Sequence, residues 1–175
     1  MEIKDEIIIG NVGRFVEVKN HNFLIDMFCE LKNQIPNAKL LLVGEGELRE
    51  KLYKKVCTLG LETSVIFAGQ RNDTYRFYQA MDVFVFPSIM EGLGIVAIEA
   101  QAAGLPCYVS SNVPREVAIT SLYHMFRLTD GTHALASSII KDELYLHKRS
   151  DMSEQIINAG YDLAKSIEKF EELYS

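Results

Sequence analysis

Short runs of apolar residues alternate along the chain with segments in which apolar residues recur every three to four positions. The runs are typical of strands buried on both faces of a sheet, and the recurring segments are typical of amphipathic helices. The pattern predicts strands at residues 6–12, 38–43, 64–68, 82–86 and 106–110, and a weaker one at 125–128. It predicts helices at residues 20–35, 48–59, 74–81, 93–103, 132–140, 152–158 and 161–174.

Strands that alternate with helices form βαβ units, which place the strands in a parallel sheet with helices on both faces. We therefore predict an α/β fold built on a doubly wound, Rossmann-like parallel sheet. Such sheets bind ligands outside the carboxyl ends of their strands. The turns to inspect for chemistry are residues 13–20, 44–47, 69–72, 87–94 and 110–114.

Composition narrows the class of protein without naming a function. The 175 residues carry a net charge of −6, so we expect no basic surface for nucleic acid or for an anionic membrane. A hydrophobic fraction of 48% is that of an ordinary globular domain. Cys29, Cys57 and Cys107 are widely spaced, which favours free thiols in a reducing compartment.

The first turn places Arg14 and Lys19 between a strand and a helix. A forked arginine contact and a lysine point charge could clamp a diphosphate there, beside a helix N-terminus that favours anions. On this fragment alone, two solvated surface cations are an equally good interpretation. The turn has neither the glycine spacing of a dinucleotide-binding fingerprint nor that of a P-loop.

The fourth turn is the most informative segment. Gly92 and Gly94 flank the predicted start of a helix, so a ligand can approach bare backbone N–H groups. Glu99 is the only charged residue between Gly92 and Pro114. Because an unpartnered buried carboxylate is costly, Glu99 either reaches solvent or accepts hydrogen bonds. Ribose hydroxyls are suitable donors, and a structural role in capping a neighbouring loop is the alternative.

The histidines do not indicate a metal site, because the four of them are scattered without the spacing of metal ligands. His21 follows the first turn and could line a cleft. We interpret it as a surface histidine at the start of a helix.

Together these turns resemble the C-terminal, nucleotide-sugar-binding half of a GT-B glycosyltransferase of the group 1 kind, the retaining enzymes of family 4. Glu91 and Glu99, with seven residues between them, match the paired-glutamate motif of that family. The other matching segments, in chain order, are Gly13-Arg14 with Lys19, Gly44-Glu45-Gly46, Phe67-x-Gly69 and the glycines and prolines of residues 87–106.

The resemblance implies a role for each motif residue. Arg14 and Lys19 would neutralise the donor diphosphate, and Glu91 would contact the transferred sugar, so these three form the expected catalytic set. Glu99 would hold the ribose hydroxyls. The remaining expected binding residues form the wall beside the nucleotide (Gly44, Gly46), meet the base (Gln70, Arg71) or face the sugar hydroxyls and phosphate (Gly92, Leu93, Gly94, Ile95).

The resemblance also implies an incomplete enzyme. Residues 1–175 would be the C-terminal donor-binding domain, one half of a GT-B fold, and the N-terminal acceptor domain would be absent from this chain. The complete enzyme would transfer the sugar of a UDP-, GDP- or ADP-sugar, with retention and without a metal or other cofactor. The acceptor would be a saccharide or a lipid-linked molecule in cell-surface polysaccharide synthesis of the exopolysaccharide or capsule type. The isolated domain would be inactive.

The implied partners are the nucleotide-sugar donor and the missing acceptor domain, and not nucleic acid. A cytoplasmic location is expected, with a peripheral position at the inner membrane face only through the missing domain or a lipid-linked acceptor. Two alternatives stay open: a non-catalytic nucleotide-binding partner subunit, and a nucleotide-sugar epimerase or phosphorylase of the same architecture. The family's usual Lys-Gly is Lys19-Asn20 here, which we expect to change the loop shape but not its charge.

Overall fold

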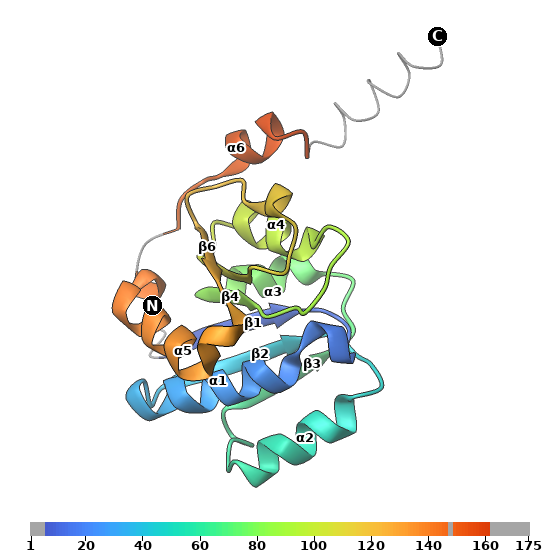
Figure 1. Ribbon diagram of the computed structural model, residues 1–175, viewed down its shortest axis with the longest axis vertical. Coiled ribbons are helices and arrows are strands. Elements are labelled where there is room, and N and C mark those ends of the chain that lie inside the picture. The colour runs from blue at the N-terminus through green and yellow to red at the C-terminus, as the bar shows by residue number, and fades with distance from the viewer. Residues whose placement is uncertain (1–5, 147–148, 162–175) are drawn as a thin grey trace.

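A parallel sheet of six strands forms the centre of the computed structural model, which describes residues 6–146 and 149–161 (Figure 1). The strands are β1 (Ile7–Val12), β2 (Ala38–Val43), β3 (Val65–Gly69), β4 (Val83–Phe86), β5 (Cys107–Ser110) and β6 (Tyr123–Phe126). Their order across the sheet is β3-β2-β1-β4-β5-β6, and every neighbouring pair is parallel. The strand order therefore reverses direction between β1 and β4, which is where such sheets bind ligands.

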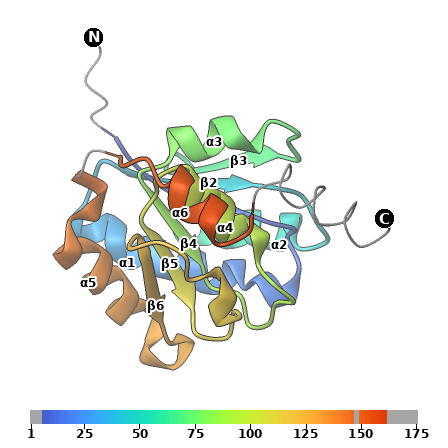
Figure 2. The ribbon, with the colours of Figure 1, turned by 90° about the horizontal axis from the view of Figure 1, so that it is seen from above.

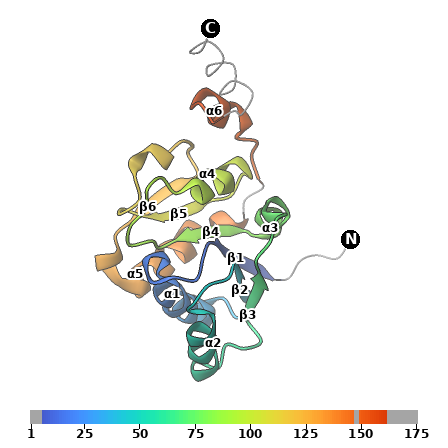
Figure 3. The same ribbon diagram turned by 90° about the vertical axis from the view of Figure 1, so that its right-hand side faces the viewer.

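Helices cover both faces of the sheet, as the alternating pattern predicts. They are α1 (His21–Gln34), α2 (Arg49–Thr58), α3 (Thr74–Ala80), α4 (Ile95–Ala102), α5 (Gly131–Asp142) and α6 (Ser153–Asn158). Figure 3 shows α1, α2 and α5 on one side of the sheet and α3 and α4 on the other. In Figure 2, α6 lies over α4, and Ile156 of α6 belongs to the same apolar cluster as Ile98 of α4.

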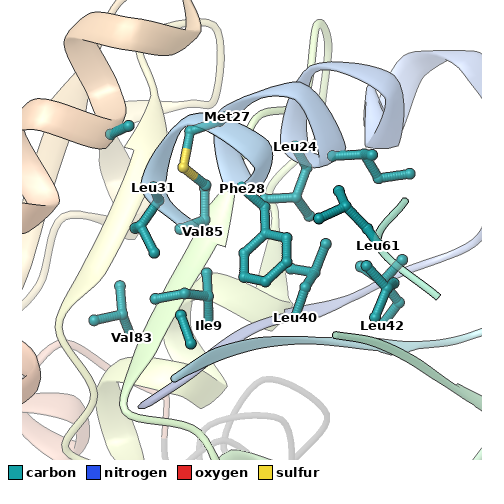
Figure 4. Packing of buried hydrophobic residues seen from close by; sticks show 14 of the residues in the cluster. Ile9, Leu24, Met27, Phe28, Leu31, Leu40, Leu42, Leu61, Val83 and Val85 are labelled. Atoms are coloured by element: carbon teal, nitrogen blue, oxygen red, sulfur yellow. The ribbon is translucent and has the colours of Figure 1, made fainter. Parts of the chain in front are cut away.

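Each face of the sheet packs its own apolar core. On the α1 face, Phe28 of α1 lies over Ile9 of β1 and Leu40 of β2 (Figure 4). On the α4 face, Met81 lies against β1 so closely that a Cβ on Gly10 would stand 2.1 Å from its sulfur atom. Burial on both faces explains why the strands read as continuous apolar runs.

The predicted elements are confirmed, with boundary shifts of one or two residues. The helix expected from residue 93 begins at Ile95, because Gly94 takes a left-handed conformation with φ of 89° and acts as its N-cap. The last strand lies at Tyr123–Phe126 rather than at 125–128. It is a half-buried edge strand, so its apolar signal is weak. The helix predicted at 161–174 falls outside the described residues from 162 onward.

Four short 3₁₀ turns complete the described chain: η1 (Glu17–Lys19), η2 (Arg115–Val117), η3 (Leu128–Asp130) and η4 (Leu144–Leu146). The turn η1 lies between β1 and α1 at the carboxyl edge of the sheet, and it positions Lys19 there. Over residues 6–146 and 149–161, no helix combines the length and the apolar character needed to cross a bilayer.

Candidate functional site

The loops that follow β1, β2 and β3 enclose a hollow of about 410 Å³ at the carboxyl edge of the sheet. The loops after β1 and β2 are visible at the right-hand side of Figure 1. We call this cavity the first hollow. Its lining residues come from β1 and its loop (Val12, Gly13, Arg14), from β2 and its loop (Val43, Gly44, Glu45, Gly46) and from the segment after β3 (Gln70, Arg71, Thr74).

Two glycines allow the loop after β2 to pack directly on the loop after β1. Gly44 adopts φ of +145°, and a Cβ there would stand 2.0 Å from the carbonyl oxygen of Gly13. A Cβ on Gly46 would lie 2.6–2.8 Å from the backbone of Phe15. The N–H of Phe15 donates to the carbonyl of Glu45 at 2.9 Å. Gly44 and Gly46 therefore hold the backbone on either side of Arg14, in addition to lining the hollow.

Arg14 borders the first hollow with an unbalanced charge. Its side chain is exposed, and it makes no ion pair or side-chain hydrogen bond with any residue that the structure describes. Arg71, on the opposite wall, is different: its guanidinium forks onto Asp73 at 2.9 and 3.1 Å. The hydrogen bond from Arg71 lowers the pKa of Asp73. Among the described residues that line this hollow, Arg14 is thus the cation without a partner. The side chain of Arg71 is already paired, so only its backbone is available for other contacts.

Lys19 and Glu91 form an ion pair between the loops after β1 and β4. Lys19 Nζ lies 2.5 Å from Glu91 Oε1, and their side chains are only 21% and 10% exposed. Ser88 Oγ donates to the same carboxylate oxygen at 2.5 Å. Lys19 Nζ also stands 5.2 Å from the centre of the Phe86 ring, a cation–π distance. Both donors approach Oε1, and Oε2 accepts no hydrogen bond from the described residues.

Backbone hydrogen bonds fix the loop that carries Glu91. Ile89 N–H donates to Val18 O at 2.8 Å, which attaches this loop to η1. Asn112 Nδ2 donates to Ile89 O at 3.0 Å, which attaches it to the loop after β5. Three strand-end loops are therefore joined around the Lys19–Glu91 pair.

The N-terminus of α4 follows this loop without a side-chain cap. The first N–H groups of any helix have no partner within the helix, so the N–H groups of Ile95 and Val96 are available to an anion, whereas that of Ala97 donates to Gly94 O at 2.9 Å. Gly92 is exposed, and a Cβ there would meet nothing within 4 Å. Leu93 packs in part against the α4-face core, and the Ile95 side chain is exposed.

Glu99 lies one turn further along α4 and reaches solvent. It borders a second hollow of about 370 Å³ between α3 and α4. Tyr78 OH donates to Glu99 Oε2 at 2.7 Å. Burial, and after it the hydrogen bond to Glu99, raises the pKa of Tyr78 well above its usual value, so the phenol stays protonated and remains a donor. Thr74 lines both hollows and marks their boundary.

The structure thus groups the expected site residues in three neighbouring places. Arg14, Gly44, Gly46, Gln70 and Arg71 border the first hollow. Lys19 and Glu91 form an ion pair, with the residues of 92–95 following in the same loop and helix start. Glu99 does not border the first hollow and belongs to the second. No group of three or more His, Cys, Asp or Glu side chains suited to a metal ion occurs among the described residues.

One expectation about this region is wrong. His21 is not a surface residue: it is 1% exposed, and its ring packs edge-on against Phe15 at 4.8 Å. Neither ring nitrogen has a hydrogen-bond partner, and burial, with a smaller contribution from Lys19, lowers its pKa to about 4. The spacing of His21, Leu24 and Phe28 along one helix face was the signal for this burial.

Asn20 stands where the family's usual Lys-Gly has its glycine, and its effect on the loop shape stays a prediction. It adopts φ of 55° and ψ of 42°, the left-handed conformation that glycine favours and asparagine tolerates better than most residues. The loop therefore takes a shape that glycine would also allow. Sequence reasoning also missed Tyr78 as the partner of Glu99, since nothing local links residues in two different helices.

The fold described above is found in a family of sugar-transferring enzymes. The family model described as "Glycosyl transferases group 1" matches residues 2–161, so the chain belongs to this family. EpsF of Bacillus subtilis (strain 168), which is named as a glycosyltransferase, is 34% identical over 165 residues. That match covers 93% of this chain and 43% of EpsF.

Two further comparisons concern an enzyme with a named activity and a solved C-terminal domain. It is 27% identical over 177 residues to the UDP-Gal:alpha-D-GlcNAc-diphosphoundecaprenol alpha-1,3-galactosyltransferase of Escherichia coli, covering 98% of this chain and 46% of the enzyme. The solved C-terminal domain of the group 1 family protein LpcC from Francisella tularensis superposes with a TM-score of 0.73 at 20% identity. That match covers 90% of this chain and 87% of the LpcC domain, and it shows the shared fold.

The chain spans less than half the length of these two curated relatives. The sheet of six parallel strands between helices matches the Rossmann-like domains of GT-B glycosyltransferases. The expected family and the expected fold class are therefore confirmed.

Proposed function

We propose that this chain is the donor-binding domain of a retaining, metal-independent glycosyltransferase that binds a nucleoside diphosphate sugar. One observation carries the proposal. The Lys19–Glu91 pair joins the loops after β1 and β4, the two strands between which the sheet order reverses. Such a position is where doubly wound sheets bind their ligands. The free guanidinium of Arg14 follows the same strand β1.

The three neighbouring places suit the parts of a nucleotide sugar. In this proposal the diphosphate lies between Arg14, Lys19 and the N-terminus of α4, and the base lies against residues 70 and 71 in the first hollow. The ribose passes Thr74 and meets Glu99. This path uses the one residue that the two hollows share.

In the proposed reaction, positive charge beside the leaving diphosphate matters more than a general acid that protonates it. When the bond between the sugar and the diphosphate breaks, its electron pair moves onto the leaving phosphate oxygen. Arg14, Lys19 and the first N–H groups of α4 would stabilise that negative charge. Glu91, whose Oε2 accepts no hydrogen bond from a described residue, would face the transferred sugar.

We also propose that an acceptor-binding domain lies in another part of the complete protein and that the isolated chain does not transfer sugar. The near-equal coverage of this chain and the C-terminal domain of LpcC supports this assignment. The acceptor would be a saccharide or a lipid-linked molecule of cell-surface polysaccharide synthesis, met in the cytoplasm or at the inner membrane face. The name of the Escherichia coli relative, which includes a diphosphoundecaprenol acceptor, favours that class.

Calorimetric titration of the 175-residue chain with UDP, GDP and ADP tests the proposal. One of the three is expected to bind, and Glu99→Ala is expected to weaken that binding by about tenfold, as the loss of a charged hydrogen bond does. Glu50→Ala, which removes an exposed carboxylate in the first turn of α2, is the matched control and should leave binding unchanged. Binding of none of the three, or equal effects of the two substitutions, would overturn the donor site.

A further inference from the structure

The carboxylate of Glu99 is fixed from one side by a residue outside the family motif. Tyr78 OH donates to Glu99 Oε2 at 2.7 Å, and this bond connects α3 to α4. Glu99 Oε1 accepts no hydrogen bond from the residues that the structure describes. A carboxylate that accepts a hydrogen bond through one oxygen keeps its other oxygen free, and the bond restricts its rotation.

The tyrosine itself is held rigidly. Its side chain is only 2% exposed, and its ring packs against Phe84 of β4 at 5.8 Å between ring centres. Its backbone carbonyl accepts a hydrogen bond from Arg149 Nη2 at 2.9 Å, which secures the C-terminal end of α3. The phenol oxygen therefore has a set position relative to the sheet, and Glu99, which is exposed and otherwise free to rotate, is oriented by it.

We infer that Tyr78 is a positioning residue for ribose recognition. It directs Glu99 Oε1 into the second hollow, where this oxygen accepts hydrogen bonds from the ribose hydroxyls of the nucleotide. This inference rests on the proposed function of Glu99. The elevated pKa of Tyr78 is consistent with it, because the phenol then donates throughout the physiological range. Without the hydroxyl, Glu99 keeps its charge but loses its orientation, so hydroxyl recognition suffers and phosphate recognition does not.

The chain contains a matched control for this inference. Tyr108 of β5 is also 2% exposed and also donates to a carboxylate at 2.7 Å, that of Asp142. It belongs to the core on the α1 face, whereas Tyr78 belongs to the core on the α4 face. Tyr78→Phe and Tyr108→Phe thus remove the same group from the same kind of bond, one beside Glu99 and one on the other side of the sheet.

The experiment compares UDP, GDP and ADP, each with its 2′,3′-dideoxy analogue, on the 175-residue chain by calorimetry. For the nucleotide that binds, the wild-type chain is expected to prefer the ribose form by about tenfold. Tyr78→Phe is expected to reduce this preference to about threefold or less, with similar affinity for the dideoxy form. Tyr108→Phe is expected to lower thermal stability comparably and to leave the preference at its wild-type value.

The outcomes distinguish a failure of the inference about Tyr78 from a failure of the proposed function. A tenfold preference that survives in Tyr78→Phe overturns the positioning role and leaves the donor site intact. An equal loss in both tyrosine variants also overturns it, because the loss then follows stability. A wild-type chain that binds both forms equally overturns the ribose contact of Glu99 and the inference with it. Should Tyr78→Phe not fold, Tyr78→Met removes the donor while filling the space flexibly, with the same expected result.

Discussion

Lys19 Nζ and Glu91 Oε1 lie 2.5 Å apart, although 72 positions separate the two residues in the sequence. The pair brings together two side chains that the family resemblance assigns to different parts of the donor, the diphosphate and the sugar. The ammonium of Lys19 and the carboxylate of Glu91 balance each other's charge. Arg14 is then the cation of the site whose charge no described residue balances.

This balance predicts that Glu91→Gln tightens nucleoside diphosphate binding by the isolated chain. Removing the carboxylate charge frees Lys19 to interact with the diphosphate, a gain of about 1 kcal/mol or fivefold for a partly exposed pair. Calorimetry in low salt measures the gain, which should shrink at high salt because of screening. Glu50→Gln changes the net charge equally on the exposed start of α2 and should have no effect. Unchanged or weaker binding by Glu91→Gln would contradict the prediction.

Arg14→Ala is expected to affect turnover more than donor binding in the complete enzyme. Arg14 faces the hollow with no competing partner among the described residues, and negative charge grows on the leaving diphosphate as the reaction proceeds. A loss of kcat of about 100-fold is expected, as for removal of one charge-stabilising donor. The dissociation constant of the nucleoside diphosphate, measured separately, should rise much less. Weaker binding with kcat unchanged would assign Arg14 to ground-state recognition alone.

The two glycines of the fourth turn should respond differently to alanine. Gly94 has a left-handed φ, and a Cβ there would stand 3.0 Å from Val113 and 3.2 Å from Phe86, so Gly94→Ala should lower the unfolding free energy by about 1–3 kcal/mol. Gly92→Ala meets no neighbour and should change stability by less than about 0.5 kcal/mol. Urea denaturation measures both values.

Gly92 also separates ligand contact from folding. If donor sugar approaches the backbone of this turn, Gly92→Ala weakens binding of the nucleotide sugar while stability stays the same. Calorimetry with the nucleotide sugar against the nucleoside diphosphate alone locates the effect at the sugar. Full retention of both affinities would remove Gly92 from the binding set.

His21 should make stability depend on pH in the acid range. Its native pKa of about 4 is below its ordinary value of 6.5, so between these values the unfolded chain binds more protons than the native one. The contribution of neutral His21 to the unfolding free energy is therefore complete above pH 6.5. It is lost as the pH drops toward 4, which lowers the unfolding free energy by up to about 3 kcal/mol.

Denaturation of His21→Leu between pH 4.5 and 7.5 checks this expectation. The substitution removes the titrating ring and its two unpartnered nitrogens, so the dependence of stability on pH should become shallower. His133→Gln, at an exposed position on α5, should keep the wild-type slope. A His21→Leu slope equal to that of the wild-type chain would assign the acid sensitivity to other groups.

Local sequence patterns are enough to predict the helices and strands and their order along the chain. The strand at Ala38–Val43 was placed to the residue, because a continuous apolar run between Pro36 and Gly44 has few other interpretations. The start of α4 was placed two residues early, because the left-handed conformation of Gly94 depends on its contacts with Val113 and Phe86. The burial of His21 is indicated in part by the helix face that it shares with Leu24 and Phe28, and it is completed by Phe15 of the preceding loop.

By itself, the sequence determined the alternation of strands and helices, the parallel sheet and the set of polar residues at the strand ends. These follow from the period of apolar positions and from the conformational preferences of glycine and proline, which act within a few residues. Only the tertiary structure decided that Lys19 meets Glu91 and that Tyr78 meets Glu99. Those contacts require β1 to lie beside β4 and α3 to lie beside α4, and the order of strands across a sheet is set by the packing of the whole chain.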